Sequence, residues 1–340
     1  MLKTTFQSLF GVLCAAILGV SLASAADVIA ELAASRVITL TPSDSLEKAP
    51  VVSGVTLDPT GKLLAAAGDD HLVHVFDVDR GTQLQRLAWH TDWVKAAAFR
   101  PDGGMLATAG ADRRICLWEM AAKGRPHTLP ELTAAVSTLV YSPDGRKLAA
   151  AGFNGRVWIF HADTGQRLQE LAGPGSDIRS LVFSPDGSRL AAAGRTGVVR
   201  IWEADGGRQM ADVPLSSRRI HAMAFSSDGK LLAAAGQQRV VWLLDGLTGQ
   251  LATTLPERPG EVRSLCFCGD SLLASGGSSN VIHLWNLETK QEKCRLVGHT
   301  GSIAALVYDA RKGTLLSGSF DTTVRVWPVG GQAADALTQR

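Results

Sequence analysis

The chain has 340 residues, of which 46% are hydrophobic and 19% charged, and its formal net charge is +2. A charge this small excludes a nucleic-acid binder that relies on a long-range basic field. The 35 glycines, beside many Val, Ile and Leu residues, indicate a globular fold of short strands joined by tight turns.

Residues 1–25 have the pattern of a secretory signal peptide. Lys3 is the only charged residue there, and an apolar run over residues 9–22 follows it. The run ends in Ala23-Ser24-Ala25, so we expect cleavage after Ala25 and a periplasmic or secreted product. An uncleaved segment would instead anchor the chain, because the apolar stretch is close to the length of a spanning helix. After cleavage we expect no membrane span.

Residues 26–35 are expected to be a linker, and a predicted strand follows them. Residues 36–41 read Arg-Val-Ile-Thr-Leu-Thr, an alternating and partly β-branched sequence that is typical of a strand. At the other end of the chain, residues 331–340 lack strand character and are expected to form a flexible tail.

Between these ends, a turn signal recurs at a fixed interval along the sequence. Its glycine accepts positive φ and occurs at Gly61, Gly103, Gly145, Gly187 and Gly229, and two intervals later at Gly313. Around each turn lie an alternating strand, a strand of small residues and two further short strands. Four strands in about 42 residues are typical of a propeller blade. The sequence therefore predicts an all-β fold: one seven-bladed β-propeller of four-stranded antiparallel blades over residues 36–330.

Two repeats carry the most specific motifs. Residues 89–94 read Trp-His-Thr-Asp-Trp-Val, residues 298–303 read Gly-His-Thr-Gly-Ser-Ile, and residues 317–327 read Ser-Gly-Ser-Phe-Asp-Thr-Thr-Val-Arg-Val-Trp. These segments resemble the WD-repeat β-propeller family, although the Trp-Asp dipeptide itself is absent. With the signal-peptide pattern, the chain resembles an exported, bacterial-type member, and the absence of Asn-x-Ser/Thr sequons fits a bacterial source. In this family repeats are offset from blades, so residues 36–41 are expected to complete the seventh blade and close the ring.

The resemblance also implies a buried hydrogen-bond relay of His, Ser or Thr, Asp and Trp in two blades. The residues that match it are His90, Thr108, Asp112 and Trp118 in the second repeat, and His299, Ser317, Asp321 and Trp327 in the seventh. A His-Asp-Ser set could instead form a catalytic triad. We favour the structural role, because the set occurs twice at the same repeat positions and includes a tryptophan. The other repeats have no matching His and are expected to rely on packing.

For binding, the family uses the top face, the narrow face at which the innermost strands begin. Transferring its positions to this chain gives basic residues over blades four to six and aromatic residues elsewhere. The candidates are Trp93, Lys95, Phe153, Arg179, Arg195, Arg219, His221, Arg263 and Phe320. Arginine and aromatic side chains are enriched at interface hot spots, and arginine binds carboxylates in bidentate fashion. We therefore expect a protein or peptide partner with an acidic patch.

The resulting hypothesis is an extracytoplasmic protein-interaction scaffold that is monomeric and has no catalytic residue, cofactor or metal. The four cysteines beyond the signal segment are expected to be buried, mostly free thiols. The alternative is a small-ligand-binding or hydrolytic propeller enzyme that uses the central channel. That alternative requires carboxylates or histidines that converge on the axis, and the sequence offers only scattered ones. No haem-attachment motif, phosphate-binding glycine loop or nucleophile elbow is present.

Overall fold

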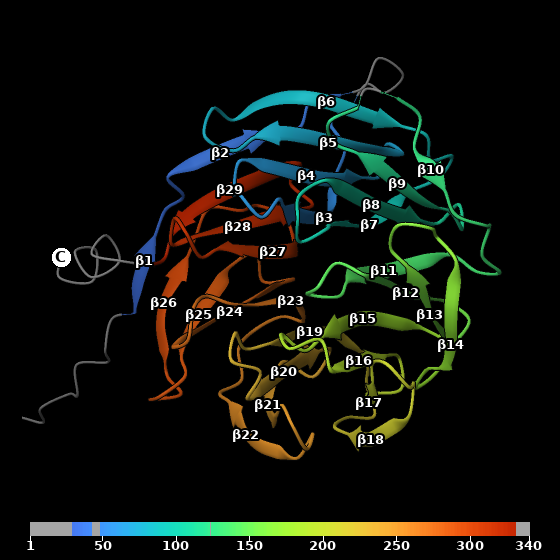
Figure 1. The fold of residues 1–340 in the computed structure, drawn as a ribbon. Helices are drawn as coiled ribbons and strands as arrows, with labels where there is room; N and C mark the ends of the chain where they lie inside the picture. Colours follow the sequence, from blue (N-terminus) through green and yellow to red (C-terminus); the bar gives the residue numbers. More distant parts are fainter. Residues whose placement is uncertain (1–28, 43–47, 123, 331–340) are drawn as a thin grey trace, which may run out of the picture.

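The computed structural model describes residues 29–42, 48–122 and 124–330. Within these residues, seven sheets are arranged in a ring around a central axis, which confirms the predicted seven-bladed propeller (Figure 1). The predicted signal peptide, residues 1–25, and the predicted tail, residues 331–340, lie outside the described residues.

The core of each blade is an antiparallel sheet, and in the first five blades the four strands follow one another from the central axis outward. Blade one consists of β3 (Val52–Leu57), β4 (Leu63–Gly68), β5 (Leu72–Asp77) and β6 (Thr82–Ala88). Blade two consists of β7 (Val94–Phe99), β8 (Met105–Gly110), β9 (Ile115–Glu119) and β10 (His127–Thr128). Blade three consists of β11 (Val136–Tyr141), β12 (Lys147–Gly152), β13 (Arg156–His161) and β14 (Arg167–Ala172). Blade four consists of β15 (Ile178–Phe183), β16 (Arg189–Gly194), β17 (Val198–Glu203) and β18 (Gln209–Pro214). Blade five consists of β19 (Ile220–Phe225), β20 (Leu231–Gly236), β21 (Val241–Asp245) and β22 (Leu251–Leu255).

The last two blades each include a strand from the N-terminal part of the chain. The sixth contains β23 (Val262–Phe267), β24 (Leu272–Gly277), β25 (Ile282–Asn286) and β26 (Glu292–Leu296), with β1 (Ala30–Leu32) at its edge. The seventh contains β27 (Ile303–Asp309), β28 (Thr314–Ser319) and β29 (Thr323–Pro328), with β2 (Arg36–Thr39) as its outer strand.

The small residues of the second strand in each blade allow neighbouring blades to pack closely. Ala191, Ala192 and Ala193 on β16 are fully buried in the clusters between blades. Gly194 ends this strand, and a Cβ atom there would lie 1.8 Å from the carbonyl oxygen of Asp177. Any side chain at this position would therefore push the start of β15 away from its partner strand.

The pairing of β2 with β29 closes the ring. Arg36 lies opposite Val326 and Thr39 opposite Thr323 in an antiparallel register, and in Figure 1 the blue β2 runs beside the red β29. Ile38 is 2% exposed and packs with residues of the first and seventh blades. The prediction that the segment at residues 36–41 supplies the outer strand of blade seven is confirmed, and the strand itself covers Arg36–Thr39.

Part of the expected linker, residues 26–35, is a strand. β1 pairs in parallel with β26, with Leu32 opposite Leu296, and the amide of Val297 donates to the carbonyl of Leu32 at 2.9 Å. Leu32 is buried in the cluster between blades six and seven. A three-residue segment is too short to show the alternation of apolar and polar residues that predicts a strand. This strand forms because the edge of β26 offers backbone groups to pair with.

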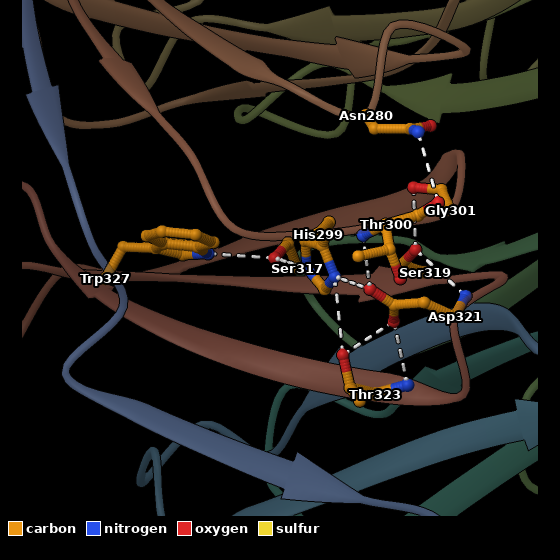
Figure 2. A network of polar contacts seen from close by, with 9 residues as sticks. All are labelled: Asn280, His299, Thr300, Gly301, Ser317, Ser319, Asp321, Thr323 and Trp327. Carbon is orange, nitrogen blue, oxygen red and sulfur yellow. Dashed lines mark hydrogen bonds and ion pairs between the residues drawn. The ribbon is translucent and has the colours of Figure 1, made fainter.

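The two sets of relay residues form hydrogen-bonded chains. In blade seven, His299 Nδ1 lies 2.7 Å from Asp321 Oδ2, and its Nε2 lies 2.7 Å from Ser317 Oγ (Figure 2). The indole of Trp327 donates to the same Ser317 oxygen at 2.8 Å. Each buried polar atom of the relay thus has a partner, as a low-dielectric interior requires.

Blade two contains the same arrangement. His90 lies 2.8 Å from both Asp112 and Thr108, and Trp118 donates to Thr108 at 2.9 Å. The repetition supports the structural role over a catalytic triad, because in both blades the hydroxyl accepts from an indole.

The expectation that the remaining blades rely on packing alone is wrong for blades one and six. In blade one, His74 and Asp70 are buried and their side chains lie 3.0 Å apart. In blade six, Trp285 donates to Ser275 at 2.8 Å, and His283 pairs with Glu292. The family's relay motif does not predict these pairs, because their histidine lies on the third strand of the blade, whereas the relay histidine precedes the first strand.

Truncating Ile38 tests the closure. Ile38→Ala is expected to lower the free energy of unfolding by about 2–5 kcal/mol, the usual cost of removing a buried branched side chain. Val37, on the same strand, is 48% exposed, so Val37→Ala is the matched control and should have little effect. Urea titration of both variants measures the difference. Equal unfolding midpoints for the two variants would show that β2 does not hold the ring closed.

The relay histidine predicts a loss of stability in acid. Burial lowers the pKa of His299 below its usual 6.5 and outweighs the opposing hydrogen bond and charge of Asp321. The unfolded chain therefore binds this proton first, and stability should fall as the pH drops below about 6.5. His299→Gln should flatten the dependence of the melting temperature on pH between 7 and 5. His127→Gln, at an exposed position, is the control, and an equal change of slope in both variants would refute the assignment.

Candidate partner-binding face

Every innermost strand carries a β-bulge at its second residue. In β15, for example, the register with β16 shifts between Ile178 and Ser180 and leaves Arg179 unpaired. The bulged residues of the seven blades are Ser53, Lys95, Ser137, Arg179, His221, Arg263 and Ala304. A bulge redirects a side chain out of the regular alternation of a strand. The propeller thus presents one side chain from each blade at the beginning of its innermost strand.

These seven residues line the mouth of the channel. Together with Phe320 they surround a cavity of about 190 Å³, which we call the channel cavity. Four residues predicted to lie on the top face, Lys95, Arg179, His221 and Arg263, are all part of this lining. Arg195 and Arg219 lie outside this lining, and Arg195 is exposed.

The basic residues over blades four to six have carboxylate neighbours. Arg179 Nε lies 2.6 Å from Asp177 Oδ1, and an Arg219 nitrogen lies 3.0 Å from Asp177 Oδ2. Arg263 lies 3.6 Å from Glu261. The expected arc of basic charge is therefore partly neutralised, and the two carboxylates hold the arginines in place. Arg195 contributes its charge at the exposed rim.

The three exposed aromatic residues each lie beside a cation. Lys95 Nζ is 5.1 Å from the ring centre of Trp93, and the guanidinium of Arg179 is 4.7 Å from that of Phe153. Phe320 forms a third pair with the guanidinium of Arg263 at 5.8 Å. The exposed fractions of Trp93, Phe153 and Phe320 are 51%, 38% and 41%. From the sequence we predict basic residues over blades four to six and aromatic residues around the rest of the face, but the cation–π pairs between them are not predicted.

Burial and mutual repulsion change the protonation of this face. The pKa of His221 is lowered to about 4, first by burial and then by the charge of Arg263, whereas Glu261 opposes the shift. Burial, followed by the charge of Arg179, also lowers the pKa of Lys95. His221 is therefore neutral at pH 7, and the arginines carry most of the positive charge.

A larger cavity, which is not predicted from the sequence, lies on the side of the propeller. It measures about 500 Å³ and lies between β6 and β9, with Trp118, Met120 and Arg125 in its lining. It forms beside β10, which has only two residues and pairs only with Cys116 and Leu117 of β9. The short outer strand could have been noticed in the sequence, because blade two lacks a long alternating run after residue 122.

The described cysteines, Cys116, Cys266, Cys268 and Cys294, are free thiols, and Cys266 is only partly buried. Burial raises the pKa of the Cys116 thiol to about 12 and that of Cys294 to about 11. Within the part of the chain that the structure describes, no helix is long and apolar enough to cross a bilayer.

Comparison with known proteins gives short local similarities. The chain is 42% identical over 48 residues to the Periodic tryptophan protein 2 homolog of Neurospora crassa, which is 14% of this chain and 5% of that protein. It is 44% identical over 55 residues to the THO complex subunit 6 homolog of Danio rerio, or 16% of this chain and 17% of that protein. It is 50% identical over 42 residues to the Probable serine/threonine-protein kinase PkwA of Thermomonospora curvata, which is 12% of this chain and 6% of that protein. The chain thus spans less than a fifth of the length of these relatives.

The family model described as "WD domain, G-beta repeat" matches six segments, which together cover more than half of the chain: residues 39–77, 81–119, 125–161, 165–203, 249–286 and 290–328. The unmatched stretch contains most of blade five, where Leu244 occupies the position that holds Trp118 in blade two and Trp327 in blade seven. Leu244 is fully buried, so the blade forms without the tryptophan. With seven blades and six matched repeats, the chain belongs to the WD-repeat β-propeller family.

Proposed function

We propose that the chain is a protein-interaction scaffold that binds its partner on the top face. WD-repeat propellers are generally scaffolds of this kind. The observation that carries the proposal is the set of three exposed aromatic rings, each against a cation that lines the channel cavity. Aromatic and arginine side chains supply most hot spots, and scattered exposed residues do not form such a set.

The charges favour a partner with an acidic patch. Arg195 is exposed, and the guanidinium of Arg263 is only loosely paired, at 3.6 Å from Glu261. A carboxylate of the partner would accept bidentate hydrogen bonds from either group. The neutral state of His221 at pH 7 keeps the positive charge on the arginines, which are planar and suited to this contact.

Side-chain removal on the top face is the direct test. In a Trp93→Ala, Arg195→Glu double variant, partner binding should weaken at least about 100-fold, because a hot-spot residue is worth about 2 kcal/mol or more and a charge reversal adds repulsion. Site-specific photo-crosslinking at Phe320 in the native compartment identifies the partner, and titration of that partner gives the affinity.

The matched control lies on the opposite end of the blades. Arg146 is exposed in the turn between β11 and β12, so Arg146→Glu makes the same charge change away from the top face. Unchanged affinity in the double variant, or an equal loss in the Arg146→Glu control, would contradict the top face as the binding site.

We also propose that the chain acts outside the cytoplasm. The support is the pattern of residues 1–25: one lysine, an apolar run and Ala23-Ser24-Ala25. N-terminal sequencing of the protein recovered after cell fractionation should begin at Ala26 in the periplasmic or secreted fraction. An intact N-terminus in the membrane fraction would favour the anchored form, and an intact N-terminus in the cytoplasm would refute export.

A further inference from the structure

The lining of the channel cavity is positively charged and lacks a counter-charge of its own. Four of its eight residues are Lys95, Arg179, His221 and Arg263, and within the described part of the chain no carboxylate belongs to the lining. Asp177 and Glu261 contact the arginines from outside the cavity. Lys95, Arg179 and Arg263 therefore carry the positive charge of the lining at pH 7, where His221 is neutral.

The two serines of the lining do not relieve this charge. Ser53 donates to the carbonyl of Val94 at 2.6 Å, and Ser137 donates in the same way to the carbonyl of Ile178. Both hydroxyls thus bind the backbone of the next blade and stabilise the ring. The side chains that remain to interact with the contents of the cavity are the basic ones.

Three buried nitrogen atoms of this group have no hydrogen-bond partner among the described residues. They are Nε2 of His221 and the Nε atoms of Arg179 and Arg263, and that of Arg179 lies in an ion pair with Asp177. Glu261 Oε2 lies 3.7 Å from His221 Nε2, which is too far for a hydrogen bond. Buried donors without acceptors cost free energy, so an acceptor in the cavity would be stabilising.

From this arrangement we propose that the channel cavity binds a compact oxyanion with two or more negative charges, such as a phosphate or a small polycarboxylate. The volume of about 190 Å³ corresponds to about six water molecules, which fits such an ion and excludes a folded element. The arginines supply forked N–H donors, and Lys95 supplies a point charge from the opposite side. The inference goes beyond partner binding and does not depend on it.

The protonation of the lining agrees with an anion site. The groups that surround His221 are Arg179, Arg219 and Arg263, which lower its pKa, and Glu261, which raises it. A bound dianion would oppose the three arginines and raise this pKa. Binding should therefore take up a proton, and affinity should rise as the pH falls from 7 toward the folded pKa of about 4.

Isothermal titration of the purified full chain at low salt tests the site, with sulfate, inorganic phosphate and acetate as probes. Sulfate and phosphate should bind saturably with a dissociation constant of about 1 mM or below, and acetate at least about tenfold more weakly. Sulfate does not titrate in this range, so its affinity should rise between pH 7 and pH 5, and His221→Gln should remove that rise. A pH-independent sulfate affinity would contradict the role of His221.

Two variants and one control locate the site. Arg263→Gln and Lys95→Gln should each weaken sulfate binding at least about tenfold, and melting temperatures near that of the parent chain show that each is folded. Arg208→Gln removes the same charge at a position 71% exposed and away from the cavity, and should leave binding unchanged. The proposal is refuted if neither dianion binds saturably, if acetate binds as tightly, or if the control loses as much affinity as Arg263→Gln. Because no partner is present, these outcomes leave the test of partner binding independent.

Discussion

The closure of the ring by β2 is the constraint on which the rest of this structure depends. Each blade buries its small-residue strands against two neighbours, so an open array would expose the faces and edges of its end blades. The chain joins the ends by pairing residues from the N-terminal part with β29, the last strand among the described residues. Ile38 and Leu40, both buried, lie at the junction between blades one and seven. Because this contact joins the two ends of the propeller sequence, its loss would affect every blade through its neighbours.

Closure also produces the site. Seven innermost strands converge on the channel, and a bulge at the same position in each one directs a side chain to the opening. The backbone arrangement is nearly seven-fold, whereas the side chains are not. Blades one, three and seven contribute Ser or Ala, and blades two, four, five and six contribute basic groups. Differences at one position per blade thus make the charge around the channel opening uneven, although the backbone of the blades repeats.

Much of the fold could be predicted from the sequence because its cause is local. A turn glycine at a fixed interval specifies the blades, and the alternation of residues 36–41 identifies the closing strand. The relays also follow a fixed spacing, since the interval from His90 to its aspartate equals the interval from His299 to its own. The polar pair of His74 and Asp70 has no such spacing, and it forms because both side chains are buried in the same blade.

The parts that could not be predicted depend on three-dimensional packing. β1 needs the exposed edge of β26, which exists only after blade six has formed. The contact of Arg179 with Phe153 joins adjacent blades. The bulge that directs the Arg179 side chain cannot be recognised from the alternation of polar and apolar residues along β15. For the same reason the sequence placed the basic residues on the top face without revealing that Asp177 and Glu261 hold them. The position of a side chain on a strand could be inferred, but its partners across a blade interface could not.

Hydrogen–deuterium exchange of the backbone amides in β2 measures the closure most directly. The amide of Ser35 donates to the carbonyl of Val326 at 2.8 Å, and that of Leu40 to the carbonyl of Thr322 at 3.0 Å, which brackets the ladder between β2 and β29. If β2 closes the ring, these amides should exchange as slowly as those of the strands in the interior of the blades, because their opening requires the ring to open. Exchange at the rate of an exposed peptide, with the interior strands still protected, would contradict the account.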